Sequence, residues 1–149
     1  MKTTTINQAI EKHNKKMEKE FKKPLRINPL QEECILKELA HNTGTTQYFK
    51  IPFSEVVYTD GISDLINKCS CYWLISDIAI LKQFNKLGSG YFFTIKIELN
   101  QNTQGCVLSV LDWNTDEVVY KKVIGYTDFP LNKFEFYLKD NCFLLPSED

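Results

Sequence analysis

The chain has 149 residues, 43% hydrophobic and 25% charged, with a formal net charge of −1. These values are typical of one soluble globular domain that buries about two-thirds of its unfolded surface. We expect a cytoplasmic protein, because no run approaches the ~18 apolar residues of a membrane span and the first residues lack a signal-peptide core.

The first 44 residues predict two helices. Thr5 to Gln8 has the spacing of a capping box, and apolar residues at near-helical intervals extend a helix over about residues 5–22. Asn28-Pro29 is typical of an N-cap followed by proline in the first helical turn, and Asn42 to Gly44 ends this second helix. We therefore predict a helical N-terminal extension over 1–44, before an α+β domain over 45–149.

Positive charge is concentrated at the start of the chain. Residues 1–26 hold eight Lys/Arg and three Glu, whereas the other 123 residues hold ten Lys/Arg and sixteen Asp/Glu. A basic arm on an acidic body can contact an anionic partner, but we favour a solvated helix face or an arm that folds back on the body, because Glu11, Glu18 and Glu20 interrupt the basic run. The candidate partner-binding residues are Lys12, Lys15, Lys16, Lys19, Lys22 and Lys23, with Arg26 beside them.

The next segment predicts a short strand and two helices. QYFKIPF is strand-like at its start, and Pro52 confines it to a sheet edge. ISDLINKC at 62–69 has one apolar helical face, as a short surface helix requires. CYWLISDIAILKQF at 71–84 is apolar nearly all round, which predicts a helix buried in the middle of the core.

After Gly90 the apolar residues alternate with period two, which is typical of strands. YFFTIKIEL, CVLSVLDW and VVYKKVIGY predict three strands, and KFEFYL with CFLLP predicts a final hairpin. Helices followed by an antiparallel β-meander indicate the α+β class, with the helices packed on one face of the sheet.

The letters YTD occur twice, at 58–60 and 126–128. An aspartate at a turn or helix start can accept backbone N–H groups, so capping by Asp60, with Thr59 able to share the role, and by Asp128 is the simpler interpretation. The alternative is a cleft in which the fold unites Tyr58, Asp60, Asp77, Tyr126 and Asp128. Asp77 is included because a carboxylate in an apolar segment needs either an exposed edge or a dedicated partner.

The cysteines indicate neither a disulfide framework nor a metal site. Their number is odd and most lie in apolar runs, where a thiol acts as a small buried hydrophobic group. They are Cys34, Cys69, Cys71, Cys106 and Cys142. The two histidines lie outside residues 45–149, so we expect no zinc site, no cofactor and no Ser-His or Cys-His catalytic pair.

Several segments together resemble a known family. They are TQYF at 46–49, YTDGI at 58–62, YWLISDIA at 72–79, IGYTDFPL at 124–131 and LLPSE at 144–148. Residues 45–149 resemble an uncharacterised family of small bacterial, plasmid and phage proteins. The family's Asp-Gly-Asn turn is replaced here by Asp112-Trp113-Asn114. The resemblance implies a mobile-element setting and supplies no reaction and no catalytic residues.

Three functional hypotheses follow, of which we favour the first. It is a non-enzymatic protein-binding module, such as a phage- or plasmid-encoded inhibitor of a host or defence protein. The second is a nucleic-acid-binding accessory protein that uses the basic N-terminal helix, with binding that weakens in salt. The third is a small metal-dependent enzyme built on Asp60, Asp77 and Asp128. A membrane partner is not expected.

Overall fold

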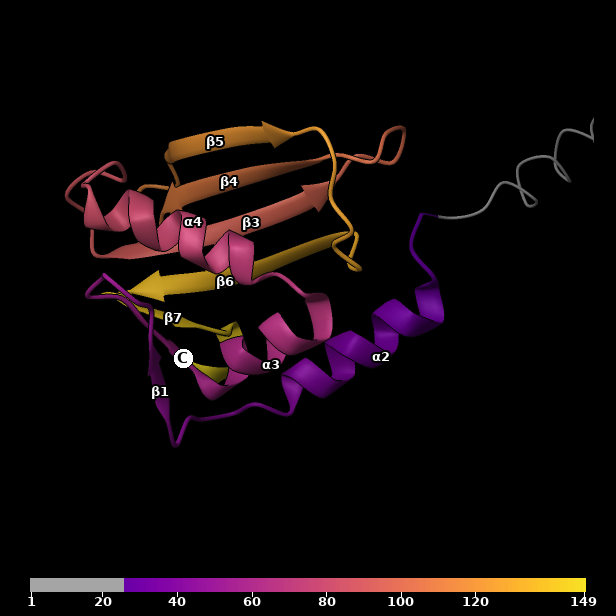
Figure 1. Cartoon of the computed structure of the whole chain (residues 1–149), viewed down its shortest axis with the longest axis horizontal. Helices are drawn as coiled ribbons and strands as arrows, with labels where there is room; N and C mark the ends of the chain where they lie inside the picture. The colour runs from indigo at the N-terminus through magenta and orange to yellow at the C-terminus, as the bar shows by residue number, and fades with distance from the viewer. Residues whose placement is uncertain (1–25) are drawn as a thin grey trace, which may run out of the picture.

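The structure is a computed structural model that describes residues 26–149. Within that range the chain forms three α-helices and a seven-stranded, mostly antiparallel sheet, so the α+β prediction is confirmed (Figure 1). None of these helices has the length and apolar character of a membrane span. The predicted helix over 5–22 and its six candidate lysines lie outside the described residues.

The three helices have local causes that the sequence shows. They are α2 (Pro29–Ala40), α3 (Asp60–Cys69) and α4 (Tyr72–Gln83). Asn28 caps α2 as predicted, because its side chain accepts hydrogen bonds from the N–H groups of Leu30 and Gln31. Ser70 ends α3 in the left-handed conformation, with φ 51°, and the chain turns there into α4.

The sheet has the order β1-β2-β7-β6-β3-β4-β5. Its strands are β1 (Tyr48–Lys50), β2 (Val57–Thr59), β3 (Phe92–Leu99), β4 (Cys106–Asp112), β5 (Val118–Ile124), β6 (Lys133–Lys139) and β7 (Cys142–Leu144), followed by a 3₁₀ turn, η1 (Pro146–Glu148). Strands β3, β4 and β5 form the predicted antiparallel meander. Strand β6 then pairs with the other edge of β3, and β2 pairs in parallel with β7. Strand β2 was not predicted from the sequence.

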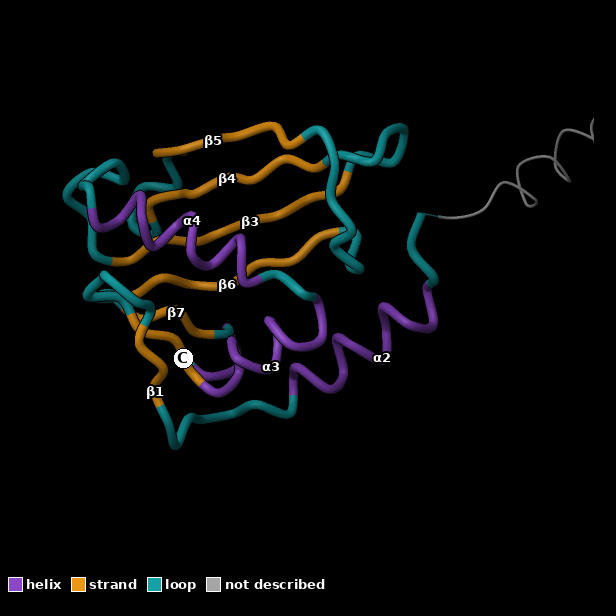
Figure 2. Tube along the Cα trace, viewed as in Figure 1, coloured by secondary structure: helices purple, strands orange, loops and turns teal. Residues whose placement is uncertain are grey.

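The helices lie on one face of this sheet (Figure 2). On β3, the side chains of Phe93, Ile95 and Ile97 are buried in the common core, whereas Lys96 and Glu98 on the alternate face are exposed. Alternation with period two produces this division, because successive side chains of a strand point to opposite faces. The core therefore lies between the sheet and its helical layer.

Helix α4 is not buried all round, so that prediction was wrong. Its inward face is completely buried, through Leu74, Ile75, Ile78 and Ala79. Its outward face leaves Ile80 54% exposed, and Phe84, the residue after the helix, 68% exposed. A helix that packs on a single sheet has only one covered face. The apolar residues on the other face are left in contact with solvent.

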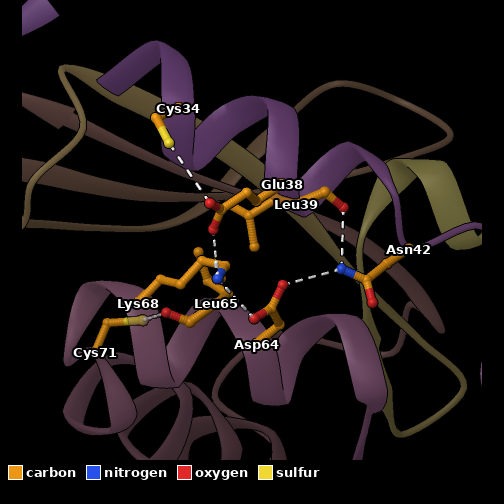
Figure 3. A network of polar contacts seen from close by, with 8 residues as sticks. All are labelled: Cys34, Glu38, Leu39, Asn42, Asp64, Leu65, Lys68 and Cys71. Carbon is orange, nitrogen blue, oxygen red and sulfur yellow. Dashed lines mark hydrogen bonds and ion pairs between the residues drawn. The ribbon is translucent and has the colours of Figure 1, made fainter. Parts of the chain in front are cut away.

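Helix α2 packs beside α3 and contacts it through a polar network (Figure 3). Lys68 lies 2.6 Å from Glu38 and 3.3 Å from Asp64, and Asn42 donates to Asp64 at 3.2 Å. Below this network, Ile35 and Leu39 of α2 enter the same core as α3. The predicted boundary at residue 44 falls in the loop after α2, and it stays a prediction.

Three of the five cysteines, Cys69, Cys71 and Cys106, are buried in the core as small apolar groups. Burial raises the pKa of Cys69 and of Cys71 to about 12, so neither is a thiolate at neutral pH. Cys34 is exposed, and a hydrogen bond to Glu38 is the main cause of its raised pKa.

Candidate protein-interaction surface

The predicted cleft residues lie in three separate places. Tyr58 and Asp60 flank the start of α3, Asp77 is exposed on α4, and Tyr126 with Asp128 follows β5. The structure brings Tyr126 and Asp128 together in one hollow of about 280 Å³, beside Trp73 of α4. Within residues 26–149, no three His, Cys, Asp or Glu side chains are grouped to hold a metal ion. Asp60, Asp77 and Asp128 therefore do not form the carboxylate site of the third hypothesis.

The two YTD stretches are turn starts, but threonine is the residue that caps. Thr59 accepts a hydrogen bond from the N–H of Ile62 at 3.3 Å, and Thr127 accepts one from the N–H of Phe129 at 3.2 Å. A hydroxyl at this position satisfies an N–H group that has no partner within the helix or turn. The expectation that Asp60 and Asp128 would do this work is corrected by that geometry.

Asp60 instead fastens the chain that precedes β1. Its carboxylate accepts the N–H of Thr46 at 2.8 Å and the hydroxyl of Thr46 at 3.0 Å. These bonds, the backbone one first, hold the pKa of Asp60 below its ordinary value. Tyr58 stacks on Phe49 with ring centroids 5.2 Å apart, and burial raises its pKa. Both residues thus have structural contacts.

The side-chain carboxylate of Glu148, near the end of the described chain, binds the first turn of α3. Glu148 accepts hydrogen bonds from the hydroxyl of Thr59 at 2.6 Å and from the N–H groups of Gly61 and Leu145. Any β-carbon on Gly61 would collide with the Glu148 side chain, so the close approach requires glycine here. The YTDG and LPSE segments are therefore two halves of one structural joint.

Arg26 belongs to the scaffold and does not extend the basic arm toward a partner. Its guanidinium donates to five backbone carbonyl oxygens at 2.6 to 3.1 Å, those of Asn100, Thr103, Gln104, Gly105 and Thr127. These carbonyls belong to the β3–β4 turn and to the segment after β5. The position of Arg26 beside the candidate lysines is therefore no sign of a partner contact, since its Nη1 and Nη2 groups are already bonded to the domain.

An apolar groove lies between α4 and the β1–β2 turn. Its volume is about 320 Å³, and Pro52 and Phe53 of the turn face Tyr72, Ile80 and Phe84 of the α4 segment across it. We call these residues the α4 groove. Contiguous exposed apolar residues of this kind are uncommon on monomeric proteins and usually mark an interaction site.

Phe53 is held in the groove wall by a rigid turn. Its φ is 62°, in the left-handed region that bulky residues avoid, and its side chain is fully exposed. Ser54 donates to the carbonyl of Ile51 at 2.9 Å and accepts from the N–H of Val56 at 3.1 Å. The side-chain oxygen of Gln83 accepts the N–H of Glu55 at 3.2 Å, which ties the turn to α4. A strained conformation is thus maintained for a side chain that no described residue covers.

Two features of the sequence are consistent with this groove, although from the sequence alone they indicate a buried helix and a strand edge. The apolar residues all round 71–84 indicated burial, although they are equally consistent with a helix that has a second apolar partner. Pro52 indicated the limit of an edge strand, and it is followed by Phe53, an aromatic residue of the type that anchors interfaces.

Comparison with known proteins identifies the family. The model of a family of unknown function, DUF6876, matches residues 33–149, and the chain belongs to this family. The predicted resemblance over 45–149 is confirmed, and the match extends back into α2. No curated protein and no solved structure matches the chain.

Proposed function

We propose that this member of DUF6876 works by binding another protein, with the α4 groove as its contact surface. The single observation that carries the proposal is Phe53, which is fully exposed at φ 62° beside the outward apolar face of α4. Aromatic side chains at the centre of an apolar patch carry a large share of binding energy in protein complexes. The left-handed conformation of Phe53 destabilises the free protein by roughly 1–2 kcal/mol. Binding energy from an interface centred on this side chain would offset that loss.

The occupant that fits the groove is a cluster of apolar side chains presented by a partner protein. Its wall is mostly apolar, and the exposed charged residues Glu55 and Asp77 directly follow the lining residues Ser54 and Ser76 in the chain. An apolar centre with a polar border is the usual anatomy of a protein interface. We propose that the partner is a cytoplasmic host or defence protein and that a mobile element encodes this chain as its inhibitor, as the bacterial, plasmid and phage setting of the resemblance suggests.

Affinity capture with matched variants tests this proposal. The double variant Phe53→Ser, Ile80→Ser removes two apolar side chains from the groove, and Leu30→Ser is the control because Leu30 is 78% exposed on α2. We expect the groove variant to lose a nuclease-resistant protein partner that the control retains. With the purified partner, the groove variant should bind at least about tenfold more weakly, equal to 1.4 kcal/mol.

Two results would contradict the proposal. One is a partner that both variants retain equally, since the groove would then have no part in the contact. The other is a captured partner that is lost after nuclease treatment and is also lost when the lysines are replaced. The lysine variant is the full-length chain in which Gln replaces Lys12, Lys15, Lys16, Lys19, Lys22 and Lys23. That outcome would support the alternative function, nucleic-acid binding through the basic segment, which also predicts a steep loss of binding with salt.

A further inference from the structure

The strand β5 is an open sheet edge seven residues long. In the described chain it pairs only with β4, whereas the opposite edge of the sheet, β1, has three residues. Every second N–H and C=O of an edge strand points away from its sheet without a partner. An added strand can therefore continue the hydrogen-bond ladder along β5.

Two lysines stand at the centre of this edge. Lys122 is opposite Leu108, on the helix-covered side, and Lys121 is opposite Ser109, on the open side. Both are exposed, and neither forms an ion pair with any residue of 26–149. Val123 beside them is 74% exposed. The edge thus combines two positive charges with exposed apolar surface.

A hollow lies at the C-terminal end of the same strand. Ile124 of β5 lines it together with Trp73 of α4 and Tyr126, and its volume is about 280 Å³. Peptides that extend a sheet obtain affinity from main-chain hydrogen bonds and specificity from pockets for individual side chains. The hollow adjoins the last residue of β5, so it can receive a side chain from the end of an added strand.

We propose that the β5 edge is a second binding surface, which takes an extended segment of a partner protein carrying two adjacent acidic residues flanked by apolar ones. The adjacent acidic residues would point to opposite faces of the added strand, as Lys121 and Lys122 do on β5. This inference rests on the proposed function as a protein-binding module, but it uses a different surface.

Charge decides among the possible occupants. A second copy that paired β5 with β5 in antiparallel register would place the lysines at the centre of one strand against those of the other, and like charges opposite each other destabilise a strand pair. Residues 1–25 of this chain carry seven lysines and three glutamates, so their net charge is positive and does not complement the two lysines of this edge. An acidic segment from another protein is the complementary occupant.

The test uses the full chain and three synthetic heptapeptides. They are TVEEVVT, its basic counterpart TVKKVVT, and TVEEVVT methylated on alternate backbone nitrogens, which cannot complete a ladder. We expect TVEEVVT to shift the NMR signals of the amides of residues 118–124 and to slow their hydrogen exchange. The basic and methylated peptides should bind at least about tenfold more weakly, and added salt should weaken the acidic peptide's binding.

A charge-reversed protein provides the decisive comparison. In Lys121→Glu, Lys122→Glu, the preference should switch from TVEEVVT to TVKKVVT, and the Phe53→Ser, Ile80→Ser groove variant should keep the original preference. The inference is overturned if millimolar TVEEVVT leaves the amides of 118–124 unchanged, or if the methylated peptide binds equally well. Because the groove variant is measured in parallel, loss of partner binding at the groove and loss at β5 are separate results.

Discussion

Helices α3 and α4 lie next to each other in the chain and on the same sheet, yet their outward faces differ. The outward side of α3 is polar, and α2 covers part of it, where Glu38 and Asn42 contact Lys68 and Asp64. The outward side of α4 leaves large apolar side chains uncovered, because solvent reaches Ile80 and Phe84. A face whose groups find partners inside the molecule needs no external ligand. The unmatched apolar face of α4 is the one that another molecule can complete.

The largest expected effect tests whether the two inward faces are equivalent. Leu65 of α3 and Leu74 of α4 are both completely buried. Leu65→Ala and Leu74→Ala should each lower the free energy of unfolding by about 2–5 kcal/mol, through lost burial and a residual cavity. Urea unfolding followed by circular dichroism measures this. If Leu74→Ala were nearly neutral, α4 would contribute little to the stability of the core. The comparison of its outward face with that of α3 would then give no support to a binding surface.

A smaller effect of opposite sign is expected at the groove. Phe53→Asn should raise the free energy of unfolding by roughly 0.5–1 kcal/mol, because asparagine tolerates the left-handed conformation that phenylalanine resists. The same variant should bind the partner more weakly. A thermal melt beside a binding titration checks both signs, and a destabilised Phe53→Asn would show that Phe53 supports the fold.

The exposed face of α4 should tolerate polar residues. Ile80→Gln is expected to change the free energy of unfolding by no more than about 0.5 kcal/mol, since Ile80 is largely exposed and glutamine is a good helix former. Chemical denaturation measures the stability, and partner affinity should fall. A loss of several kcal/mol would mean that this side chain is part of the core.

The smallest effect concerns the polar interface between α2 and α3. The hydrogen bond to Lys68 holds the pKa of Glu38 below its ordinary value. Stability from this group is therefore present above the unfolded pKa of about 4.3 and is lost as the pH falls through the lowered folded pKa. Lys68→Met should flatten that part of the stability-versus-pH curve. An unchanged curve would assign the acid sensitivity to other carboxylates, Asp60 first.

Local patterns predicted much of the fold. Each of these patterns involves only a few neighbouring residues. They are the Asn28-Pro29 cap, the apolar face of 62–69 and the alternation in the long strands, of which β3 is the clearest. These signals sufficed for the helices, the long strands and the α+β class. They come from backbone geometry and side-chain periodicity, which act over short separations.

The candidate site was not predictable in the same way, because its determinants are distant in sequence. Arg26 bonds to carbonyls between 74 and 101 residues away, and β2 has only three residues whose partner β7 lies far along the chain. Whether an apolar helix is buried on both faces depends on how many layers the domain contains. The sequence of α4 alone does not carry that information.

The joint between Thr59, Gly61 and Glu148 has a consequence for synthesis of the chain. The first turn of α3 and the parallel partner of β2 both depend on residues 142–148, which the ribosome adds more than eighty residues later. Contacts of such long sequence separation form late and slow folding. The first half of the domain therefore cannot reach its final packing before residues 142–148 have left the ribosome, and until then the apolar residues of α3 must stay soluble or be shielded by a chaperone.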